Sequence, residues 1–356
     1  MPLPASSSVR VGLIRMQLEA NEQDSARMRR AADVAHDRLY ILLEGDWSQQ
    51  SRSAIQGRLK FIYDLLSLSA PRLDARVLLP SEEAWLARSA EDAEAIICCK
   101  EEEDCVDRWM ERRTERRLPA MQKLLLDLPC CSSLTSLGWD EGTCMLLPPG
   151  NFQHVVLGGT FDRIHAGHKL LLSMTCVCAS ERVLIGVSTG PLLEGKTMRD
   201  VMQPFEQRQV RLLQLLQSLR DSVRYEIVPI SDPFGPSIVD EQLQCIVVSR
   251  ETERGGHSVN KRRVDRNLNE LVVDVVDLVG PEDADDSNKM SSTMLRRTML
   301  GSFNGADVNS LCRQGGEVGE EEFVRCTSPD VLPYIVGLTG GIASGKSTIS
   351  RMLKEE

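Results

Sequence analysis

From residue 154 the chain alternates short apolar strands with amphipathic helices, and this alternation restricts the fold more than any other feature of the sequence. The predicted elements follow one another as HVVLGG, HKLLLSMTCVCASE, RVLIGVST, PFEQRQVRLLQLLQSLRD, RYEIVPI, CIVVS and LVVDVVDLV. Strands that alternate with helices of this length pair in parallel, and the helices cover both faces of the sheet. We therefore expect an α/β domain with a parallel sheet over residues 154–300.

The first 150 residues carry a shorter version of the same pattern. RLYILLE (38–44) is a predicted strand, QSRSAIQGRLKFIYDLLSL (50–68) a predicted amphipathic helix, and ARVLLP (75–80) a second predicted strand. A strongly charged helical run then covers residues 104–126 and breaks at Pro119. This strand–helix–strand order predicts a smaller α/β region that carries no group of reactive side chains.

A length of 356 residues suggests two or three domains. Polar, glycine-containing stretches, such as GGEVGEEE in the second linker, separate the patterned segments. The predicted parts are an N-terminal tail (1–30), an N-terminal α/β region (31–131), a linker (132–153), the second α/β domain (154–300), a second linker (301–332) and a C-terminal strand–loop–helix segment (333–356).

Charge and composition exclude several classes of function. The net charge of −10 argues against broad nucleic-acid binding, which needs a basic face. No apolar run approaches the roughly 20 residues of a membrane-spanning helix, although surface attachment stays open. The eleven cysteines form no paired CxxC spacing, so we expect reduced thiols in an intracellular compartment. The N-terminus contains serine and arginine, as a mitochondrial presequence does, but Glu19 and Glu22 depart from that pattern.

The stretch HVVLGGTFDRIHAGHKLLLS (154–173) carries the clearest chemistry. Gly158 and Gly159 end a strand, so the backbone can approach a ligand at the edge where open α/β sheets bind their substrates. His165 and His168 lie on one side of the following helix start, whose N–H groups favour an anion. Together these groups predict a cradle for phosphate.

Two alternatives compete with this interpretation. The histidines could be partly buried turn residues whose hydrogen bonds are satisfied by the backbone, which is the commoner case for a single histidine. Imidazole is also a good zinc ligand, but no third and fourth ligand lie nearby, because His154 is on the strand and no cysteine lies in the loop. Two histidines that follow a strand and two glycines favour the phosphate cradle.

GGTFDRIHAGH (158–168) resembles the HxGH signature of the nucleotidyltransferase superfamily, whose members transfer a nucleotidyl group and release pyrophosphate. A second phosphate-binding signature of that superfamily resembles KMSSTMLR (289–296). Hydroxyls and N–H groups at a helix start, flanked by Lys289 and Arg296, are what triphosphate oxygens require, although an ordinary capped helix is the alternative. The resemblance implies a Rossmann-like nucleotidyltransferase domain.

Basic residues also follow the strands between the two signatures. Lys196 comes after the second strand, and a later strand is followed by Arg254, Lys261, Arg262 and Arg263. Each alone is more commonly a solvated surface residue. As a set beyond strand ends, they suit a substrate with several phosphates.

Within the superfamily, the segments GGTFDRIHAGHKLLL, LLEGK, PISDPFGP, VVSRETERGG and SSTMLRR resemble phosphopantetheine adenylyltransferase, and its eukaryotic form most. Bacterial members have Pro and Thr where this chain has Arg163 and His165. The resemblance implies transfer of the adenylyl group of ATP, with Mg²⁺, to 4′-phosphopantetheine, which gives dephospho-CoA. The implied residues are His168 and Lys196 at the α- and β-phosphates, Thr160 at the incoming phosphate, His165 at the triphosphate, Gly158, Gly159, Phe161 and Arg254 in the binding site, and Ser291, Ser292, Thr293 and Arg296 at the β,γ end.

A second motif lies near the C-terminus. GGIASGKS (340–347) fits the P-loop pattern, in which Gly340 and Gly345 shape the loop, Lys346 reaches the terminal phosphates and Ser347 binds magnesium. YIVGLTGGIASGKST resembles the start of dephospho-CoA kinase, so the two motifs together resemble the bifunctional CoA synthase family of animals. Eight residues follow Thr348, and we therefore expect a truncated kinase segment without kinase activity.

Three other functions compete with adenylyl transfer to 4′-phosphopantetheine. A nucleotidyltransferase with another acceptor would show itself in which acceptor supports pyrophosphate release. A P-loop kinase or NTPase is disfavoured by the short sequence after the motif. A non-catalytic interaction or membrane-docking protein would keep its localisation after His168→Ala. The resemblance implies a cytoplasmic protein with peripheral mitochondrial association, no nucleic-acid partner and no protein metal ligand in the adenylyltransferase.

Overall fold

The computed structural model describes residues 8–79, 87, 90–128, 152–277, 279 and 291–299. The chain divides into two compact units, residues 1–295 and 296–356. The first unit contains two five-stranded sheets, and we call the part around the first sheet (residues 9–126) the first domain and the part around the second (residues 152–276) the second domain. None of the helices in these described ranges is long and apolar enough to cross a membrane.

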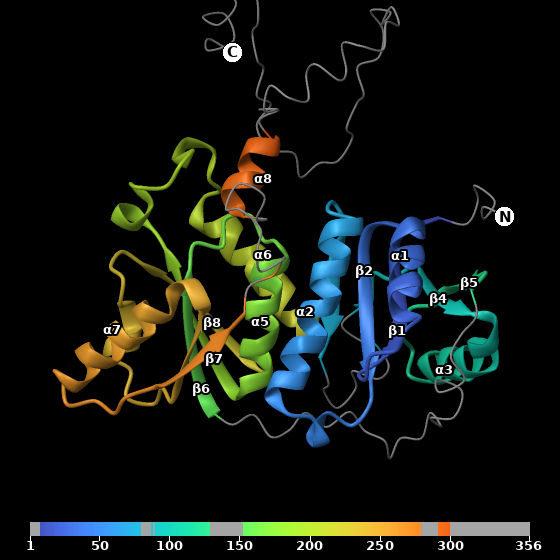
Figure 1. The fold of residues 1–356 in the computed structure, drawn as a ribbon, viewed down its shortest axis with the longest axis horizontal. Coiled ribbons are helices and arrows are strands. Elements are labelled where there is room, and N and C mark those ends of the chain that lie inside the picture. The colour runs from blue at the N-terminus through green and yellow to red at the C-terminus, as the bar shows by residue number, and fades with distance from the viewer. Residues whose placement is uncertain are drawn as a thin grey trace, which may run out of the picture. The chain divides into compact units, whose positions relative to one another are not determined.

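The first sheet is parallel throughout, with the strand order β3-β2-β1-β4-β5 (Figure 1). Its strands are β1 (Val9–Gln17), β2 (Ala35–Glu44), β3 (Asp74–Leu78), β4 (Ala95–Cys99) and β5 (Gln122–Leu126), and its helices are α1 (Asp24–Val34), α2 (Arg52–Ser69) and α3 (Glu103–Glu115). Ser51 caps α2, because its Oγ accepts a hydrogen bond from Ala54 N at 3.2 Å. The buried face of α2 repeats at helical spacing through Ile55, Leu59, Ile62 and Leu66.

Two predictions for this domain need correction. Residues 9–17 were expected in a polar tail, but they form β1, which pairs with both β2 and β4 at the centre of the sheet. Arg15 obscures the apolar pattern, yet its side chain is buried and paired with Glu44 of the neighbouring strand. The predicted helix over 104–126 ends at Glu115, and the chain beyond Pro119 forms the edge strand β5.

The second sheet is also parallel, with the order β10-β9-β6-β7-β8, as the alternating pattern predicts. Its strands are β6 (Phe152–Gly159), β7 (Ala179–Ser188), β8 (Arg224–Ile230), β9 (Cys245–Ser249) and β10 (Val272–Val276), and the helices between them are α5 (Ala166–Cys178), α6 (Phe205–Leu219) and α7 (Glu253–Val264). Helix α8 (Ser292–Met299) follows later in the chain. Helix α7 was not predicted, because its sequence contains two glycines and few apolar residues.

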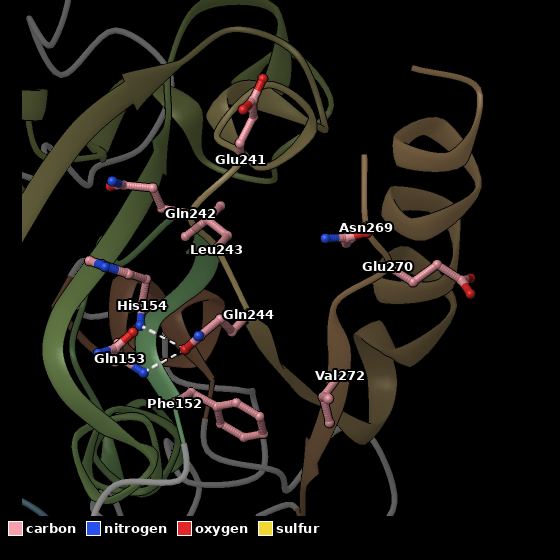
Figure 2. Close-up of a pocket in the computed structure, with 10 residues that line it drawn as sticks. All are labelled: Phe152, Gln153, His154, Glu241, Gln242, Leu243, Gln244, Asn269, Glu270 and Val272. Atoms are coloured by element: carbon pink, nitrogen blue, oxygen red, sulfur yellow. Dashed lines mark hydrogen bonds between the residues drawn. The ribbon is translucent and has the colours of Figure 1, made fainter. Parts of the chain in front are cut away.

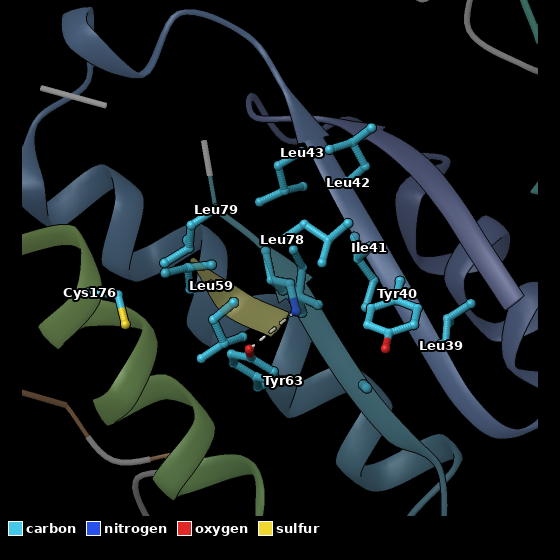
Figure 3. Close-up of a cluster of buried hydrophobic side chains, with 14 of the residues drawn as sticks. Leu39, Tyr40, Ile41, Leu42, Leu43, Leu59, Tyr63, Leu78, Leu79 and Cys176 are labelled. Atoms are coloured by element: carbon cyan, nitrogen blue, oxygen red, sulfur yellow. Dashed lines mark hydrogen bonds between the residues drawn. The ribbon is translucent and has the colours of Figure 1, made fainter. Parts of the chain in front are cut away.

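Counted from the first strand of each sheet, both sheets have the same order, 3-2-1-4-5. Helices α2 and α5 lie side by side between the sheets in Figure 1, and the hydroxyls of Tyr63 and Ser173 are 3.1 Å apart across this contact. Figure 3 shows Cys176 of α5 beside Leu59 and Leu79 of the first domain. These side chains belong to one buried cluster, so the two domains share a hydrophobic core.

Candidate active site

The predicted site lies where the strand order of the second sheet reverses. The chain runs from β6 outward to β7 and β8, and then returns to β9 on the other side of β6. Ligands of open α/β sheets bind at such a point, in the crevice outside the carboxyl ends of the strands. The loop of residues 160–165 follows β6, and the segment that begins at Arg250 follows β9. The topology therefore brings the HxGH-like loop and the region of Arg254 to one sheet edge.

The two histidines of the loop lie against one another. His165 immediately precedes α5, in an extended conformation, and His168 lies in the first turn of this helix. Their ring centroids are 4.0 Å apart, and the His168 ring is also 5.2 Å from the ring of Phe161. The two imidazoles thus lie beside one another at the start of α5, whose first N–H groups are the anion donors of the phosphate-cradle hypothesis.

Glycine is required at Gly159 by close packing against Phe161. A Cβ on Gly159 would lie 2.8 Å from Cε2 of the Phe161 ring, which is closer than real Cβ contacts allow. Phe161 itself is buried and holds a left-handed backbone conformation, with φ of 47°. This strained turn directs the Phe161 ring toward the strand end and toward His168.

Both imidazoles are neutral in the free protein. Burial lowers the pKa of His165 to about 2, with smaller contributions from His168 and Lys169. Burial also lowers the pKa of His168 to about 4, although the backbone of Arg163 and the charge of Asp162 oppose it. The Nδ1 atoms of both rings are buried without a hydrogen-bond partner in the described part of the chain. Each ring can therefore offer a ligand a neutral N–H donor, and a bound anion would favour its protonation.

Residues that the sequence analysis missed hold this loop in place. Asp162 is buried and accepts a hydrogen bond from the backbone N of Gln203 at 2.7 Å. Arg208 of α6 donates to the carbonyl oxygens of Thr160 at 2.6 Å and Ser188 at 3.0 Å. These bonds join the ends of β6 and β7. An arginine on an amphipathic helix usually lies in solvent, so the sequence alone gave no signal for this role.

The second phosphate-binding signature begins at the same loop. Ser291 Oγ accepts a hydrogen bond from Met294 N at 3.2 Å and so caps α8. Ser292 Oγ donates to the carbonyl oxygen of Arg163 at 3.2 Å, and Thr293 is half-buried beside it in the chain. The structure therefore brings Ser291 and Ser292 to the HxGH-like loop. Arg296 is buried and falls in the second compact unit, and Lys289 lies outside the described residues.

The other predicted basic residues divide into two groups. Lys196 is exposed in the segment between β7 and α6, and Arg254 is exposed in the first turn of α7, at the carboxyl edge of the sheet. The prediction for the remaining three needs correction, because Lys261, Arg262 and Arg263 lie in the last turn of α7, at its other end. Arg263 is fully buried and donates to the carbonyl oxygens of Ser237 and Asn269, both at 2.6 Å, so its role is structural.

Three further sets of residues were considered from the sequence, namely metal ligands, the P-loop and the cysteines. The described residues contain no group of three or more His, Cys, Asp or Glu that could hold a metal ion. The P-loop residues Gly340, Gly345, Lys346 and Ser347 lie outside the described residues. Six described cysteines are buried, at positions 98, 99, 105, 176, 178 and 245.

A separate polar pocket lies at the opposite edge of the second sheet. Figure 2 shows it at the amino ends of β6, β9 and β10, where Gln244 Oε1 accepts hydrogen bonds from the backbone N atoms of Gln153 and His154. Its volume is roughly 600 Å³, and its lining residues are Phe152, Gln153, His154, Glu241, Gln242, Leu243, Gln244, Asn269, Glu270 and Val272. None of these belongs to the predicted site, so this pocket is distinct from the cradle.

A parallel 3-2-1-4-5 sheet with a two-histidine, glycine-rich loop at its switch point defines a nucleotidyltransferase-type domain, and a family described as Cytidylyltransferase-like matches residues 156–298. The chain belongs to the phosphopantetheine adenylyltransferase family. It is 36% identical over 151 residues to the phosphopantetheine adenylyltransferase of Methanopyrus kandleri, and the match covers 42% of this chain and 93% of that protein.

Two further relatives carry the same name. The protein of Methanothermobacter thermautotrophicus is 38% identical over 144 residues, which cover 40% of this chain and 82% of that protein. The protein of Saccharomyces cerevisiae is 38% identical over 152 residues, or 42% of this chain and 50% of the relative. The chain thus spans about half the length of that yeast relative.

Proposed function

We propose that the chain transfers the adenylyl group of ATP to 4′-phosphopantetheine and so forms dephospho-CoA and pyrophosphate. The observation that carries the proposal is the His165–His168 pair, with ring centroids 4.0 Å apart, at the start of α5 and at the switch point of the sheet. Family membership supports this choice of acceptor, because the relatives that show the family are named phosphopantetheine adenylyltransferase.

In the proposed reaction, a phosphate oxygen of 4′-phosphopantetheine attacks the α-phosphorus of ATP. A new P–O bond forms to the α-phosphorus, the bond to the α,β-bridging oxygen breaks, and its electron pair leaves with pyrophosphate. The nucleophile is already an anion, so the step needs no general base. The protein then contributes orientation and stabilisation of charge that develops on the phosphate oxygens.

The proposed roles are those that the family resemblance implies for these residues. His168 and Lys196 stabilise charge on the α- and β-phosphates, and His165 binds the triphosphate. Thr160 orients the incoming phosphate, because it lies at the loop directly after β6. Ser291, Ser292, Thr293 and Arg296 bind the β,γ end, and the contact of Ser292 with the carbonyl of Arg163 supports the placement of the first two.

The depressed histidine pKa values fit this mechanism. A neutral imidazole donates one N–H without repelling the nearby cations Lys169 and Arg163. As negative charge develops on the transferred phosphate, protonation of His168 becomes more favourable, so the interaction strengthens in the transition state. The interaction of His168 with the phosphate is thus stronger in the transition state than in the ground state, and this difference accelerates the chemical step.

A nucleotidyltransferase with another nucleotide or acceptor is the second candidate. The match to the Cytidylyltransferase-like family favours it, since that description names transfer of a cytidylyl group. The two candidates share the phosphate cradle and differ in which base and which acceptor bind beside it. A direct comparison of substrates therefore separates them.

The decisive experiment measures pyrophosphate release by the purified chain with MgATP and 4′-phosphopantetheine. We expect release by the wild type, a loss on the order of 10² to 10³ in His168→Ala, and an unchanged rate in Lys346→Ala. CTP replaces ATP, and other phosphorylated acceptors replace 4′-phosphopantetheine, in parallel assays. Release only with one of these would establish the second candidate, and no release by folded protein would favour an interaction protein.

We also propose that the C-terminal segment belongs to a bifunctional CoA synthase. The sequence GGIASGKS supports a dephospho-CoA kinase segment, and assays for phosphorylation of dephospho-CoA test it. A cytoplasmic location with peripheral mitochondrial association is proposed from the same resemblance. Fractionation of cells that express the wild type and His168→Ala separates location from catalysis.

A further inference from the structure

The first domain repeats the strand order of the nucleotidyltransferase-type domain. The second halves of the two domains also have the same spacing, with each element 150 residues after its counterpart. In the first domain β4, α3 and β5 begin at Ala95, Glu103 and Gln122. In the second domain β9, α7 and β10 begin at Cys245, Glu253 and Val272. The turn after each helix contains a left-handed residue at the equivalent position, Arg117 with φ of 58° and Asn267 with φ of 59°.

Equivalent buried arginines complete the correspondence. Arg113 and Arg263 are both almost fully buried near the ends of these helices. Arg113 donates to the carbonyl oxygen of Ala87, and Arg263 donates to that of Ser237, which again lies 150 residues further on. Strand order, left-handed turn and buried arginine are independent features, so two copies of one fold explain them together.

The first copy lacks the phosphate cradle. Gly12 of β1 pairs with Ala95, and Val155 of β6 pairs with Cys245, so the first strands correspond with a shift of 143 residues. This shift places Glu22 and Ser25 where the second copy has His165 and His168.

The crevice at the switch point of the first copy is also closed. Arg27 of α1 and Glu102, which follows β4, form an ion pair at 2.8 Å, and their side chains are 1% and 2% exposed. The second copy has Thr252 at the position of Glu102. A carboxylate and a hydroxyl in place of the two imidazoles, and an internal ion pair in place of a ligand, do not suit a phosphate.

The first copy instead makes a specific contact next to the active site. Lys169, the residue after His168, is buried, and its Nζ lies 2.6 Å from Oδ1 of Asp74 in the first domain. Asp74 begins β3 and is also paired with Arg38 and Arg76, at 3.0 and 2.7 Å. These two arginines fix the Asp74 carboxylate on the side away from Lys169.

We propose that the first domain is a catalytically silent copy of the fold that positions His168, and that it acts through the ion pair between Asp74 and Lys169. The proposal rests on the proposed function. Asp74 is a positioning residue, because it acts through Lys169 and touches no reacting atom.

The physical reason is the cost of burying an ammonium group. Lys169 is held by a carboxylate that only the first domain supplies, so α5 cannot rotate or slide without separating the pair. Burial alone would raise the pKa of Asp74, but Lys169 and Arg76 outweigh it and hold this pKa well below its ordinary range. One turn along α5, the Tyr63–Ser173 contact adds a second fixed point. Misplacing a catalytic group by about 1 Å can cost on the order of 10² in rate.

The test compares Asp74→Asn, Lys169→Met and the double variant in the full chain. We expect kcat for dephospho-CoA formation to fall by roughly 10- to 100-fold in each single variant, with the KM for ATP little changed. The double variant should lose no more than either single variant, because both remove the same interaction. Asp74→Glu keeps the charge and should restore part of kcat.

Ser218→Ala is the matched control. This substitution removes a 3.0 Å hydrogen bond from Arg76 across the same interface. Because Ser218 lies near the end of α6 and not on α5, the kcat of the variant should stay at the wild-type value. Additive losses in the double variant, or folded single variants with wild-type kcat, would overturn the proposal. If Asp74→Asn does not fold, Lys169→Met alone carries the test, because it leaves no buried cation behind.

An NMR measurement separates this proposal from the proposed function. The ring resonances of His168 and Phe161 should shift in Asp74→Asn and Lys169→Met but not in Ser218→Ala. A wild type that forms no dephospho-CoA refutes the proposed function while these shifts still decide the positioning role. Unchanged resonances in both interface variants would refute positioning whatever the activity.

Discussion

The imidazole rings of His165 and His168 lie with their centroids 4.0 Å apart and their planes tilted by 37°. Two protonated rings at this distance would repel, and burial disfavours both charges. The pair is therefore neutral and has buried Nδ1 atoms without hydrogen-bond partners among the described residues. Such a pair destabilises the free protein slightly, because two buried polar atoms lack hydrogen-bond partners.

This pair predicts a loss of stability in mild acid. The unfolded rings take up protons near pH 6.5, whereas His165 and His168 in the folded chain have pKa values of about 2 and about 4. The unfolded state binds more protons between about pH 4 and pH 6.5, so the free energy of unfolding falls as pH drops through this window. We expect about 1 kcal/mol per pH unit for each histidine.

Urea unfolding at several pH values between 4.5 and 7.5 measures this slope. His165→Gln should reduce it, whereas His257→Gln should not, because the His257 side chain is 65% exposed. Asp74, whose pKa is held low, loses its stabilising charge only below this window. A slope equal in wild type and His165→Gln would contradict the neutral pair.

Gly159→Ala should damage the site through Phe161. The new methyl group would lie 2.8 Å from the Phe161 ring, so the ring must move, and it is packed against His168. We expect the free energy of unfolding to fall by about 1 to 3 kcal/mol and kcat to fall with it. Pyrophosphate release and urea unfolding measure the two effects.

Gly57→Ala is the control for this substitution. Nothing lies within 4 Å of a Cβ at Gly57, which is in the middle of α2, so alanine should stabilise the chain by roughly 0.5 to 1 kcal/mol. A Gly159→Ala variant with wild-type kcat would show that Phe161 does not support His168.

The sequence alone predicts the bounds of strands correctly where the strands are short and bounded by turn residues. RYEIVPI and CIVVS coincide with β8 and β9, and the glycines and histidines of the HxGH-like motif mark the loop at the switch point. Strand β1 was missed because Arg15 interrupts its apolar run, and only pairing with Glu44 makes that residue compatible with burial.

What the sequence could not show depends on distant residues. Helix α7 is held through the buried Arg263, although its own residues favour a helix weakly. Asp74 and Lys169 are 95 residues apart, and neither has a motif of its own. Tertiary contacts of this kind decide the role of a charged residue, and local patterns assign it to the surface by default.

Arg208→Met tests how strongly the strand ends are joined. The variant leaves the carbonyl oxygens of Thr160 and Ser188 without their buried donor, and burial already lowers the pKa of Arg208. We expect the free energy of unfolding to fall by about 2 to 4 kcal/mol, together with a loss of kcat. Arg211→Met, at an exposed position of the same helix, should change stability by less than about 0.5 kcal/mol. Equal stability of the two variants would contradict this role of Arg208.

The equivalent arginines of the two copies, Arg113 and Arg263, should each stabilise their own domain. Each donates to carbonyl oxygens of two turns in its own domain, and each is almost fully buried. Replacing either by methionine leaves those carbonyls unsatisfied, so each variant should lose about 2 to 4 kcal/mol of unfolding free energy. Lys261→Met, at an exposed position of α7, is the control and should unfold like the wild type.

Because the two domains share a core, the variants Arg113→Met and Arg263→Met test whether the domains unfold together. Because one buried cluster contains residues of both domains, damage to either copy should lower the stability of the whole unit of residues 1–295. Calorimetry should show both domains unfolding in one transition, shifted to lower temperature in Arg113→Met and in Arg263→Met alike. Two separate transitions, with only the mutated domain shifted, would mean that the copies fold independently. The first domain could then fix α5 only through local contacts such as Asp74–Lys169.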